Sequence, residues 1–198
     1  MRLFTAIELS EDARLAIAAE QKRIAEVVGR GAAGSLKWIR PEHMHLTLVF
    51  LGEIEEARAP AIIRAMGDDI GVAGPFAIVF AGIGMFPPQR APRVLWLGLS
   101  TGANEAIALQ RHVAERLSST GVAIEERPFH PHLTLARWRE SRQADRRPVA
   151  AAERDAGVAR VDVDAVTLFQ SRLSSSGPAY TVLARAPLAG LRPPRSLR

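Results

Sequence analysis

The chain has 198 residues, which is enough for one substantial hydrophobic core or for two small lobes that share one, but not for two independent domains of average size. It contains no cysteine, so disulfides, thiolate nucleophiles and thiolate metal sites are excluded. The hydrophobic share of 47% and the charged share of 24% are ordinary for a globular protein and exclude bulk disorder.

The positive charge of the chain is carried almost wholly by arginine. The formal net charge is +5, and only Lys22 and Lys37 are lysines. Arginine suits bidentate recognition of phosphate, so a phosphorylated or nucleic-acid ligand fits this composition. A GC-rich genome produces the same arginine bias, and composition alone does not separate the two explanations.

No stretch of the sequence has the pattern of a membrane segment. Residues 1–8 are too short and too soon acidic for a signal peptide, and no run approaches the roughly 18 uninterrupted apolar residues of a membrane span. We therefore expect a soluble, cytoplasmic protein without a membrane partner. Nothing in the sequence suggests an obligate protein partner, and a monomer is expected.

The first half of the chain is predicted to contain strands and helices in alternation. Ser10, followed by two acidic residues, is typical of a helix start, and the flexible stretch 31–34 is typical of a helix end. The expected elements are a strand at 3–9, a helix from Ser10 to about Gly31, a strand at 40–51 that stops at Gly52, and a helix at 55–70.

The second half is predicted to begin with two strands joined by a proline-rich loop and to continue with a helix. The expected elements are strands at 75–85 and 94–99, a helix at 104–119, a charged excursion at 137–155 with a short helix around 149–154, β structure at 158–170, a turn at 174–178, a strand at 180–184 and a frayed tail at 191–198.

A nine-residue stretch occurs twice, at residues 40–48 and 127–135, so equivalent positions lie 87 residues apart. Seven of the nine positions are identical, and the two copies hold four of the five histidines. Each copy contains a His-x-Thr-Leu sequence. This duplication predicts two halves that bring the same groups to one shared site, in a single domain over residues 1–198 with two pseudo-symmetric lobes.

On a regular strand the histidine and the threonine of each copy share one face, about 7 Å apart, while the leucines face the core. His45 and Thr47 form the first pair, and His132 and Thr134 form the second. A cleft lined by two imidazoles and two hydroxyls has what hydrolysis of a cyclic phosphodiester needs. One neutral histidine accepts a proton from water, one protonated histidine gives a proton to the departing oxygen, and the hydroxyls hold the phosphoryl oxygens.

Both copies and their context resemble a known family. His45-Leu46-Thr47-Leu48 and His132-Leu133-Thr134-Leu135 are similar to the paired His-x-Thr-x signature of the two-histidine (2H) phosphoesterases. The flanking sequence resembles the branch of RNA 2′,3′-cyclic phosphodiesterases, also called 2′-5′ RNA ligases, over nearly the whole chain. The flanking residues that carry this resemblance are Phe50-Leu51-Gly52, Arg137 and Gly177-Pro178-x-Tyr180.

The resemblance implies a bilobal α+β fold with pseudo-twofold symmetry, in which two antiparallel sheets face a central cleft and helices pack outside. It implies opening of a terminal RNA 2′,3′-cyclic phosphate to a 2′-phosphate, without metal, ATP or another cofactor, with 2′-5′ ligation as related reverse chemistry. By position, His45 would be the proton donor to the leaving 3′-oxygen and His132 the proton acceptor that activates water. The two copies are nearly equivalent, so sequence alone does not decide which histidine is the acid.

Five further residues are candidates for substrate binding, each with a structural alternative. Arg137 follows Thr134 by three positions, so a regular strand turns it away from the phosphate, and only a bend or bulge after Leu135 brings it round. Phe50 and Phe129 have the aromatic surface to stack on a base, although a strand phenylalanine is usually buried. His43 and His130 lie two positions before the catalytic candidates and are interpreted as supporting or structural residues.

Three alternative functions stay open at the level of sequence. Four imidazoles from two His-x-His pairs have the ligand number for zinc, but a metal would occupy the free acid and base. The two His-x-Thr strands read only the phosphate, so a small cyclic nucleotide or ADP-ribose 1″,2″-cyclic phosphate is an alternative substrate. A nucleotide- or RNA-binding module without turnover is the third alternative, although binding alone needs no matched acid and base.

Overall fold

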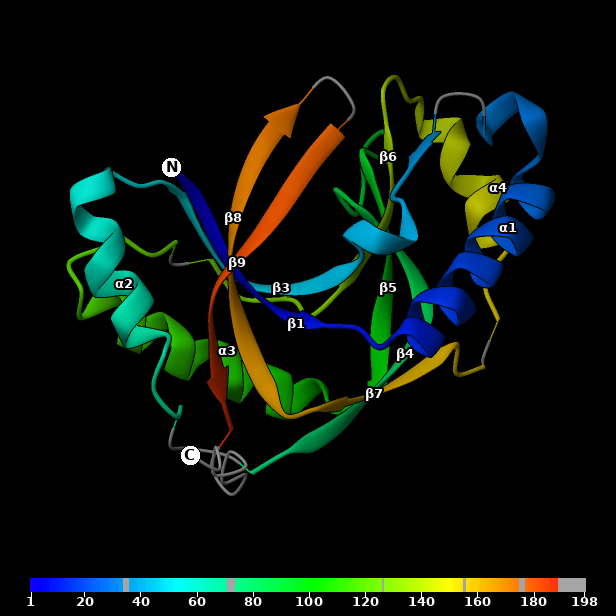
Figure 1. Cartoon of the computed structure of the whole chain (residues 1–198). Coiled ribbons are helices and arrows are strands. Elements are labelled where there is room, and N and C mark those ends of the chain that lie inside the picture. Colours follow the sequence, from blue (N-terminus) through cyan, green and yellow to red (C-terminus); the bar gives the residue numbers. More distant parts are fainter. Residues whose placement is uncertain (34–35, 71–73, 126, 155, 175–176, 189–198) are drawn as a thin grey trace.

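The structure, a computed structural model, describes residues 1–33, 36–70, 74–125, 127–154, 156–174 and 177–188. These residues form nine β-strands, four α-helices and three short 3-10 turns (Figure 1). No helix in this part of the chain is long and apolar enough to cross a membrane. The predicted frayed tail at 191–198 lies outside the described residues.

The strands form two antiparallel sheets. Sheet 1 has the order β3-β1-β8-β9, and its strands are β3 (His45–Glu53), β1 (Arg2–Glu8), β8 (Ala165–Ser174) and β9 (Gly177–Pro187). Sheet 2 has the order β2-β6-β5-β4-β7, and its strands are β2 (Leu36–Trp38), β6 (Leu133–Trp138), β5 (Val94–Thr101), β4 (Phe76–Phe86) and β7 (Ala159–Val163). The expected α+β class with two antiparallel sheets is confirmed.

The two sheets repeat one arrangement. Strand β1 is followed by helix α1 (Glu11–Ala33) and later by β3, its antiparallel neighbour, while β5 is followed by α3 (Ala103–Ser118) and then by β6, its antiparallel neighbour. The order 3-1-8-9 in sheet 1 thus corresponds to 6-5-4-7 in sheet 2, where β2 is an additional edge strand. Each His-x-Thr copy enters the equivalent strand of its sheet.

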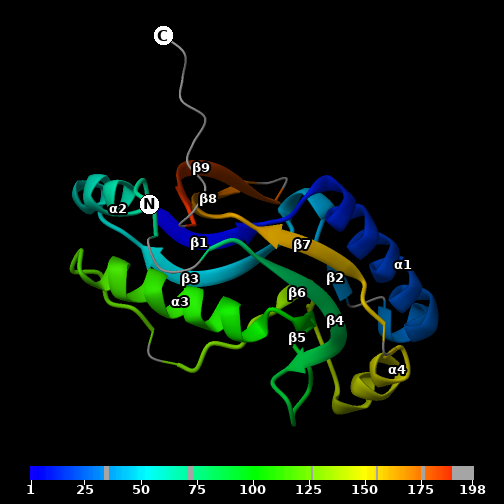
Figure 2. The same cartoon turned by 90° about the horizontal axis from the view of Figure 1, so that it is seen from below.

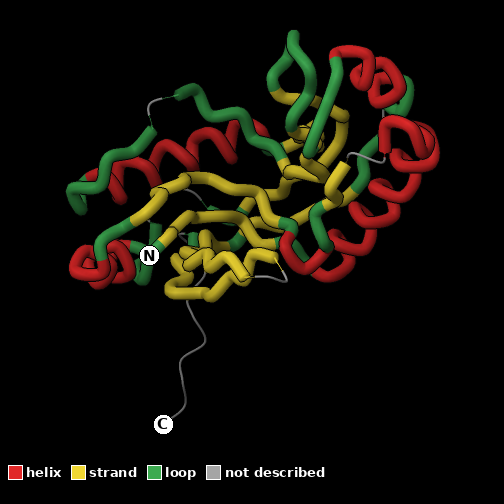
Figure 3. Tube along the Cα trace, turned by 90° about the horizontal axis from the view of Figure 1, so that it is seen from above, coloured by secondary structure: helices red, strands yellow, loops and turns green. Residues whose placement is uncertain are grey.

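Each of the two long helices packs largely against the other half of the molecule. Helix α1 contacts β2 and β7 of sheet 2 and helix α4 (Arg146–Ala150), and helix α3 contacts β3 of sheet 1 as well as β4 (Figures 1 and 2). The short helix α2 (Ala59–Ala65) lies beside α3 and β9. Seen from above, the helices flank the strands on two sides (Figure 3).

A buried carboxylate ties α1 to the second half of the chain. The Glu20 side chain accepts hydrogen bonds from Arg23 at 2.7 Å and from Arg154 at 2.6 Å, and Glu20 is only 3% exposed. A buried charge is tolerated when it is paired and hydrogen-bonded in this way.

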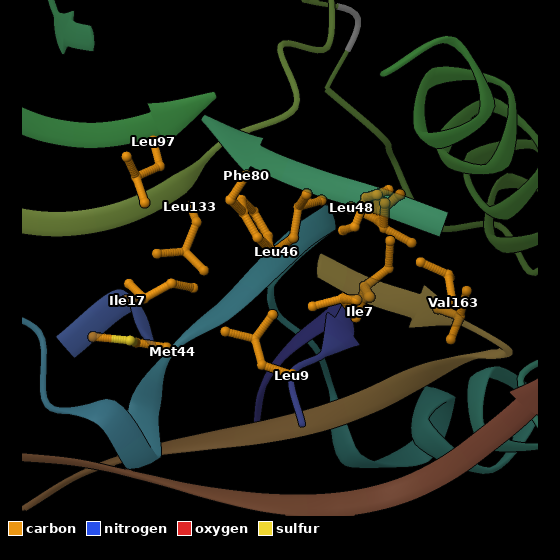
Figure 4. Close-up of a cluster of buried hydrophobic side chains, with 14 of the residues drawn as sticks. Ile7, Leu9, Ile17, Met44, Leu46, Leu48, Phe80, Leu97, Leu133 and Val163 are labelled. Atoms are coloured by element: carbon orange, nitrogen blue, oxygen red, sulfur yellow. The ribbon is translucent and has the colours of Figure 1, made fainter. Parts of the chain in front are cut away.

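One hydrophobic core serves both sheets. Leu46 of β3 and Leu133 of β6 belong to the same cluster of buried side chains, together with Phe80 of β4 and Ile17 of α1 (Figure 4). Burial of one large aliphatic side chain contributes roughly 1.5–3 kcal/mol. The leucines of both repeat copies therefore anchor their strands, as the alternation of the sequence predicted.

Most predicted elements are present, with small changes at their ends. Ser10 caps α1, since its Oγ accepts the backbone N–H of Ala13 at 3.2 Å. The first strand, the helix at 104–119 and the strands at 75–85 and 94–99 correspond to β1, α3, β4 and β5. The helix α1 bends at Gly29, whose φ of 73° is in the left-handed region.

Three predicted elements differ in their bounds, and one strand was missed. Residues 41–43 form a 3-10 turn, so the strand expected over 40–51 begins only at His45. The helix expected at 55–70 is limited to a 3-10 turn and α2, which ends at Ala65, and the short helix expected around 149–154 is α4 at 146–150. The three-residue strand β2 was missed. The β structure expected at 158–170 is confirmed, as two strands, β7 and β8, with Asp164 between them.

Candidate active site

The two His-x-Thr pairs line one cleft between the sheets, with a volume of about 550 Å³. His45 and Thr47 come from β3 of sheet 1, and His132 and Thr134 come from the start of β6 in sheet 2. The intervening leucines are fully buried on the opposite faces of both strands. The other residues that line the cleft are Lys37, Trp38, Ile39, Arg40, His43, Arg137, Gly177, Pro178 and Tyr180.

Both histidines are held by the same local hydrogen bond. The Nδ1 of His45 lies 2.9 Å from the carbonyl oxygen of His43, and the Nδ1 of His132 lies 2.8 Å from the carbonyl oxygen of His130. A carbonyl oxygen only accepts, so Nδ1 carries the hydrogen in each ring. In the neutral imidazole this leaves Nε2 as the free acceptor, the form that a general base requires.

Aromatic rings support the imidazole of His45. The Phe4 ring stacks on it with a centroid distance of 4.8 Å, and the Tyr180 ring meets it edge-on at 5.3 Å. Phe169 in turn stacks on Phe4 at 5.2 Å. These rings belong to three different strands of sheet 1, so the orientation of His45 is fixed by the sheet rather than by its own strand alone.

The imidazole of His132 has an equivalent aromatic support. Phe86 of β4 lies edge-on at 5.1 Å, and Trp96 of β5 lies at 6.0 Å. The indole of Trp96 occupies the space over Gly84, where a Cβ would overlap it. Trp96 and Phe86 lie on the strands next to and second from the His-x-Thr strand, as Phe4 and Phe169 do in sheet 1, although Trp96 pairs with Thr134 and so corresponds by register to Ala6.

Burial lowers the basicity of both histidines. It lowers the pKa of His45 to about 4, against the opposing effect of the bond to the His43 carbonyl, and the nearby His43 and Arg14 lower it further. Burial also lowers the pKa of His132, with smaller contributions of the same sign from His130 and Arg137. Without a ligand, both imidazoles are therefore neutral near pH 7.

A bulge in β6 brings Arg137 into the cleft. Trp96 of β5 lies opposite Thr134, whereas the next residue, Leu95, lies opposite Ala136, so Leu135 is the additional residue. Leu135 and Ala136 are both fully buried, which places Arg137 on the face that carries Thr134. Arg137 therefore faces the cleft, a position expected from the sequence only if the strand bends or bulges after Leu135.

The same bulge occurs in β3. Ala6 of β1 lies opposite Thr47, and Thr5 lies opposite Val49, so Leu48 is the additional residue. Phe50 then occupies in sheet 1 the position that Arg137 occupies in sheet 2. It is exposed but does not line the cleft.

The remaining predicted residues are placed differently from one another. His43 lines the cleft and meets the ring of Tyr180 edge-on at 5.4 Å. His130 instead lies beside Trp96 at 4.8 Å and lines a neighbouring hollow. Phe129 is partly buried and packs against the core. His43 and His130 thus line different hollows.

Tyr180 belongs to the site but was not among the residues proposed from sequence. Burial raises the pKa of its hydroxyl, and the positive charges of Arg137 and Arg2 act in the opposite direction, so the side chain is a neutral hydrogen-bond donor near pH 7. The Gly-Pro-x-Tyr sequence was a visible signal, but its position in β9, beside His45, depends on the pairing of four strands.

Comparison with known proteins agrees with this geometry. The sequence profile of the 2′-5′ RNA ligase superfamily matches residues 15–174. The chain belongs to this superfamily. An RNA 2′,3′-cyclic phosphodiesterase of Aquifex aeolicus (strain VF5) is 34% identical over 155 residues, which cover 78% of this chain and 82% of the relative. One of the same name from Thermotoga maritima is 30% identical over 190 residues, which cover 96% of this chain and 97% of the relative.

Solved structures share the fold of this chain. LigT of E. coli complexed with 3′-AMP superimposes with a TM-score of 0.73 at 25% identity, over 95% of this chain and 98% of LigT. The protein TT0787 of Thermus thermophilus has a TM-score of 0.68 at 27% identity, over 97% of this chain and 100% of that chain. The family membership predicted from the two His-x-Thr copies is thereby confirmed.

Proposed function

We propose that this member of the 2′-5′ RNA ligase superfamily hydrolyses RNA ends that carry a 2′,3′-cyclic phosphate to 2′-phosphates, without metal or ATP. The observation that carries the proposal is the matched pair of imidazoles across one cleft, each with Nδ1 bonded to a carbonyl and Nε2 free. The names of the relatives in Aquifex aeolicus and Thermotoga maritima support the substrate class.

In the proposed reaction the two histidines have opposite roles. Neutral His132 accepts a proton from water through Nε2 while the water oxygen forms a bond to phosphorus. The bond from phosphorus to the 3′-oxygen breaks, and protonated His45 gives its proton to that oxygen. The product has a 2′-phosphate and a 3′-hydroxyl, and each proton transfer contributes roughly 10²- to 10⁴-fold in rate.

The protonation of His45 is coupled to substrate binding. Its pKa of about 4 in the free protein leaves it neutral near pH 7. An anionic cyclic phosphate beside the imidazole stabilises the charged form and raises this pKa. The negative substrate thus brings the acid into its active state, and the empty cleft does not hold a buried positive charge on the imidazole.

Four other groups hold the phosphate. The hydroxyls of Thr47 and Thr134 donate to the nonbridging oxygens, and Arg137 neutralises their charge. Tyr180 offers a further donor from sheet 1. These contacts keep phosphorus in line between the two imidazoles. When a 5′-hydroxyl replaces water, the same acid and base give a 2′-5′ linkage, which accounts for the reverse chemistry.

The proposal also includes the organisation of the protein. Residues 1–198 form one domain of two lobes. One core serves both sheets, and each of the two long helices packs against the sheet of the other half. The protein acts as a monomer on RNA and needs no protein partner. Its location in the cytoplasm remains a prediction from the sequence.

The test is release of a 2′-phosphate from a short RNA with a 2′,3′-cyclic end, in excess EDTA and without ATP. His45→Ala and His132→Ala each lower turnover by at least about 10²-fold. His112→Ala is the matched control, because the fifth histidine lies on α3 and pairs with Glu115 at 3.7 Å. Turnover that EDTA abolishes, or that survives both substitutions, contradicts the proposal.

A further inference from the structure

A row of four apolar side chains crosses the cleft-facing side of sheet 1. Phe50 of β3, Phe4 of β1, Phe169 of β8 and Val182 of β9 lie opposite one another in consecutive strand pairs. The two inner rings are 3% and 9% exposed, whereas Phe50 is 47% exposed. The inner ring of Phe4 lies under the catalytic histidine, and both ends of the row, Phe50 and Val182, are exposed.

The direction of Phe50 follows from the bulge at Leu48. Leu48 and Val49 are both buried in the main core, so the following side chain points to the opposite face, which also carries Thr47. Phe50 lies three residues beyond Thr47, further from the start of the strand.

Arg2 lies over this ring. Its guanidinium carbon is 4.9 Å from the ring centroid of Phe50, a cation-π distance. The nearest acid by strand pairing is Glu53, which instead pairs with the N-terminal ammonium at 3.7 Å. No ion pair of Arg2 occurs within the described part of the chain. The edge of the guanidinium, with its N–H groups, is thus available to an anion.

This pair is continuous with the catalytic cleft. Tyr180 lines the cleft, its ring meets both Phe4 and His45 edge-on, and the charge of Arg2 reaches its hydroxyl. Arg137 acts on the same hydroxyl from the other sheet. Arg2 and Tyr180 both lie opposite Ser171, on the two strands beside it, so the cation that accompanies the open ring of Phe50 belongs to the same row of the sheet as Tyr180.

We propose that Arg2 and Phe50 form a second nucleotide subsite, which binds the residue that precedes the cyclic-phosphate end of a single-stranded RNA. The guanidinium of Arg2 binds the phosphate that joins the last two nucleotides, and the base of the preceding nucleotide stacks on the open part of the Phe50 ring. A flat ring beside a free guanidinium is the arrangement that single-stranded nucleic acids favour, and it does not read base identity. The inference rests on the proposed function, because it extends the same site.

The subsite gives the protein a preference for RNA ends over free cyclic nucleotides. A mononucleoside 2′,3′-cyclic phosphate fills the cleft but has no phosphate or base for Arg2 and Phe50. A trinucleotide that ends in the same cyclic phosphate has both. The kcat/KM of the wild type for the trinucleotide is therefore at least about tenfold higher than for the mononucleotide.

The experiment compares this ratio among variants of the full chain. In Arg2→Gln and in Phe50→Leu the advantage of the trinucleotide falls from about tenfold to about twofold. Phe50→Tyr keeps an aromatic ring and retains the advantage. Arg2→Gln also reduces the slope of log(kcat/KM) against log salt for the trinucleotide by about 0.7, the value for one phosphate contact on a single strand.

Two variants control for unspecific effects. Arg172→Gln removes one positive charge from β8, next to Ser171, which pairs with Arg2, but on the other face of the sheet. Leu15→Ala removes an apolar side chain that is 61% exposed on α1. Neither changes the ratio. If Arg172→Gln lowers it as much as Arg2→Gln, the effect is one of net charge and the subsite is refuted.

The outcomes separate the subsite from the proposed function. If the wild type opens neither substrate, the proposed function fails. If it opens both with equal kcat/KM, and Arg2→Gln and Phe50→Leu leave that equality unchanged, the function stands and the subsite is refuted. A change in sedimentation of Phe50→Leu, without a change in the ratio, assigns the exposed ring to a protein contact and also overturns the subsite.

Discussion

The side-chain amide of Gln21 donates a hydrogen bond of 2.9 Å to the carbonyl oxygen of Leu135, the additional residue of the bulge in β6. The same nitrogen donates to the carbonyl oxygen of Ile39 at 2.9 Å, and Gln21 is only 8% exposed. A residue of α1 thereby holds the irregular point of the strand that presents Thr134 and Arg137. Gln21 is a positioning residue in this arrangement.

Gln21→Leu is predicted to loosen this bulge. It removes one of the two bonds to the Leu135 carbonyl, because the backbone N–H of Ile39 still donates to it at 2.8 Å. We expect a loss of about 1–3 kcal/mol in the free energy of unfolding in urea. We also expect a fall in kcat/KM that is smaller in the Arg137→Ala background than in the wild type. Equal falls in both backgrounds would show that Gln21 acts on stability alone.

The pH profile of kcat/KM is predicted to be bell-shaped with its centre below pH 6.5. The two limbs report the lower and the higher of the pKa values of the acid and the base in the free protein. Since burial lowers the pKa of His132 and of His45, each limb moves to lower pH than for an exposed histidine pair. The kcat profile, measured with saturating anionic substrate, lies at higher pH. A kcat/KM optimum above pH 7 would contradict the lowered pKa values of both histidines in the free protein.

The stability of the protein is predicted to fall as the pH is lowered from 6.5 toward 4. Folded His45 has a pKa of about 4, and the unfolded side chain has about 6.5, so the unfolded state binds more protons between these values. Stability therefore rises with pH through this window, and the contribution of His45 is fully present above pH 6.5. The contribution of His45 is up to about 3 kcal/mol. Urea unfolding at pH 7 and pH 4.5 checks it, since His45→Gln loses less stability between the two.

Gly84→Ala is predicted to displace Trp96 and thereby to disturb the imidazole of His132 and lower turnover. The added methyl group overlaps the indole ring, which also contacts His132 and His130. Overpacking of this kind costs about 1–3 kcal/mol. Gly67→Ala is the control, because its Cβ meets only two backbone oxygens at 3.4 and 3.5 Å. Thermal unfolding measures the loss of stability, and turnover measures the effect on the site. An unchanged kcat in Gly84→Ala would show that Trp96 does not help to hold His132 in place.

The cleft-facing positions of the two His-x-Thr pairs were predictable because they depend only on local alternation. In β3 and β6 the buried leucines and the cleft-facing His-x-Thr groups follow the period of two that any strand has. The place of Arg137 was not predictable, since it depends on a bulge that Gln21 stabilises from a position 114 residues away in the sequence. Tyr180 was missed for a similar reason, because its neighbours in β1 and β3 are remote along the chain.

Secondary structure failed where tertiary contacts override propensity. The strand β2 has only three residues and exists because it pairs with β6 at the bulged end. The helix expected at 55–70 stops at Ala65, and the backbone N–H of Ile70 instead bonds to the carbonyl oxygen of Pro187 after β9. Neither partner is visible from the local sequence.

The strand order of sheet 1 also determines when the protein is able to fold during synthesis. The ribosome releases β1 first and β3 soon after, yet β1 lies between β3 and β8, and β8 is among the last strands to emerge. Until then one edge of β1 is unpaired. The apolar face of α1 also stays exposed until β7, which contacts it, has been synthesised. Such open edges promote aggregation of nascent chains. The strand pairing beneath His45 is thus completed only after β8 has been synthesised, and removal of β8 and β9 would leave β1 with one unpaired edge.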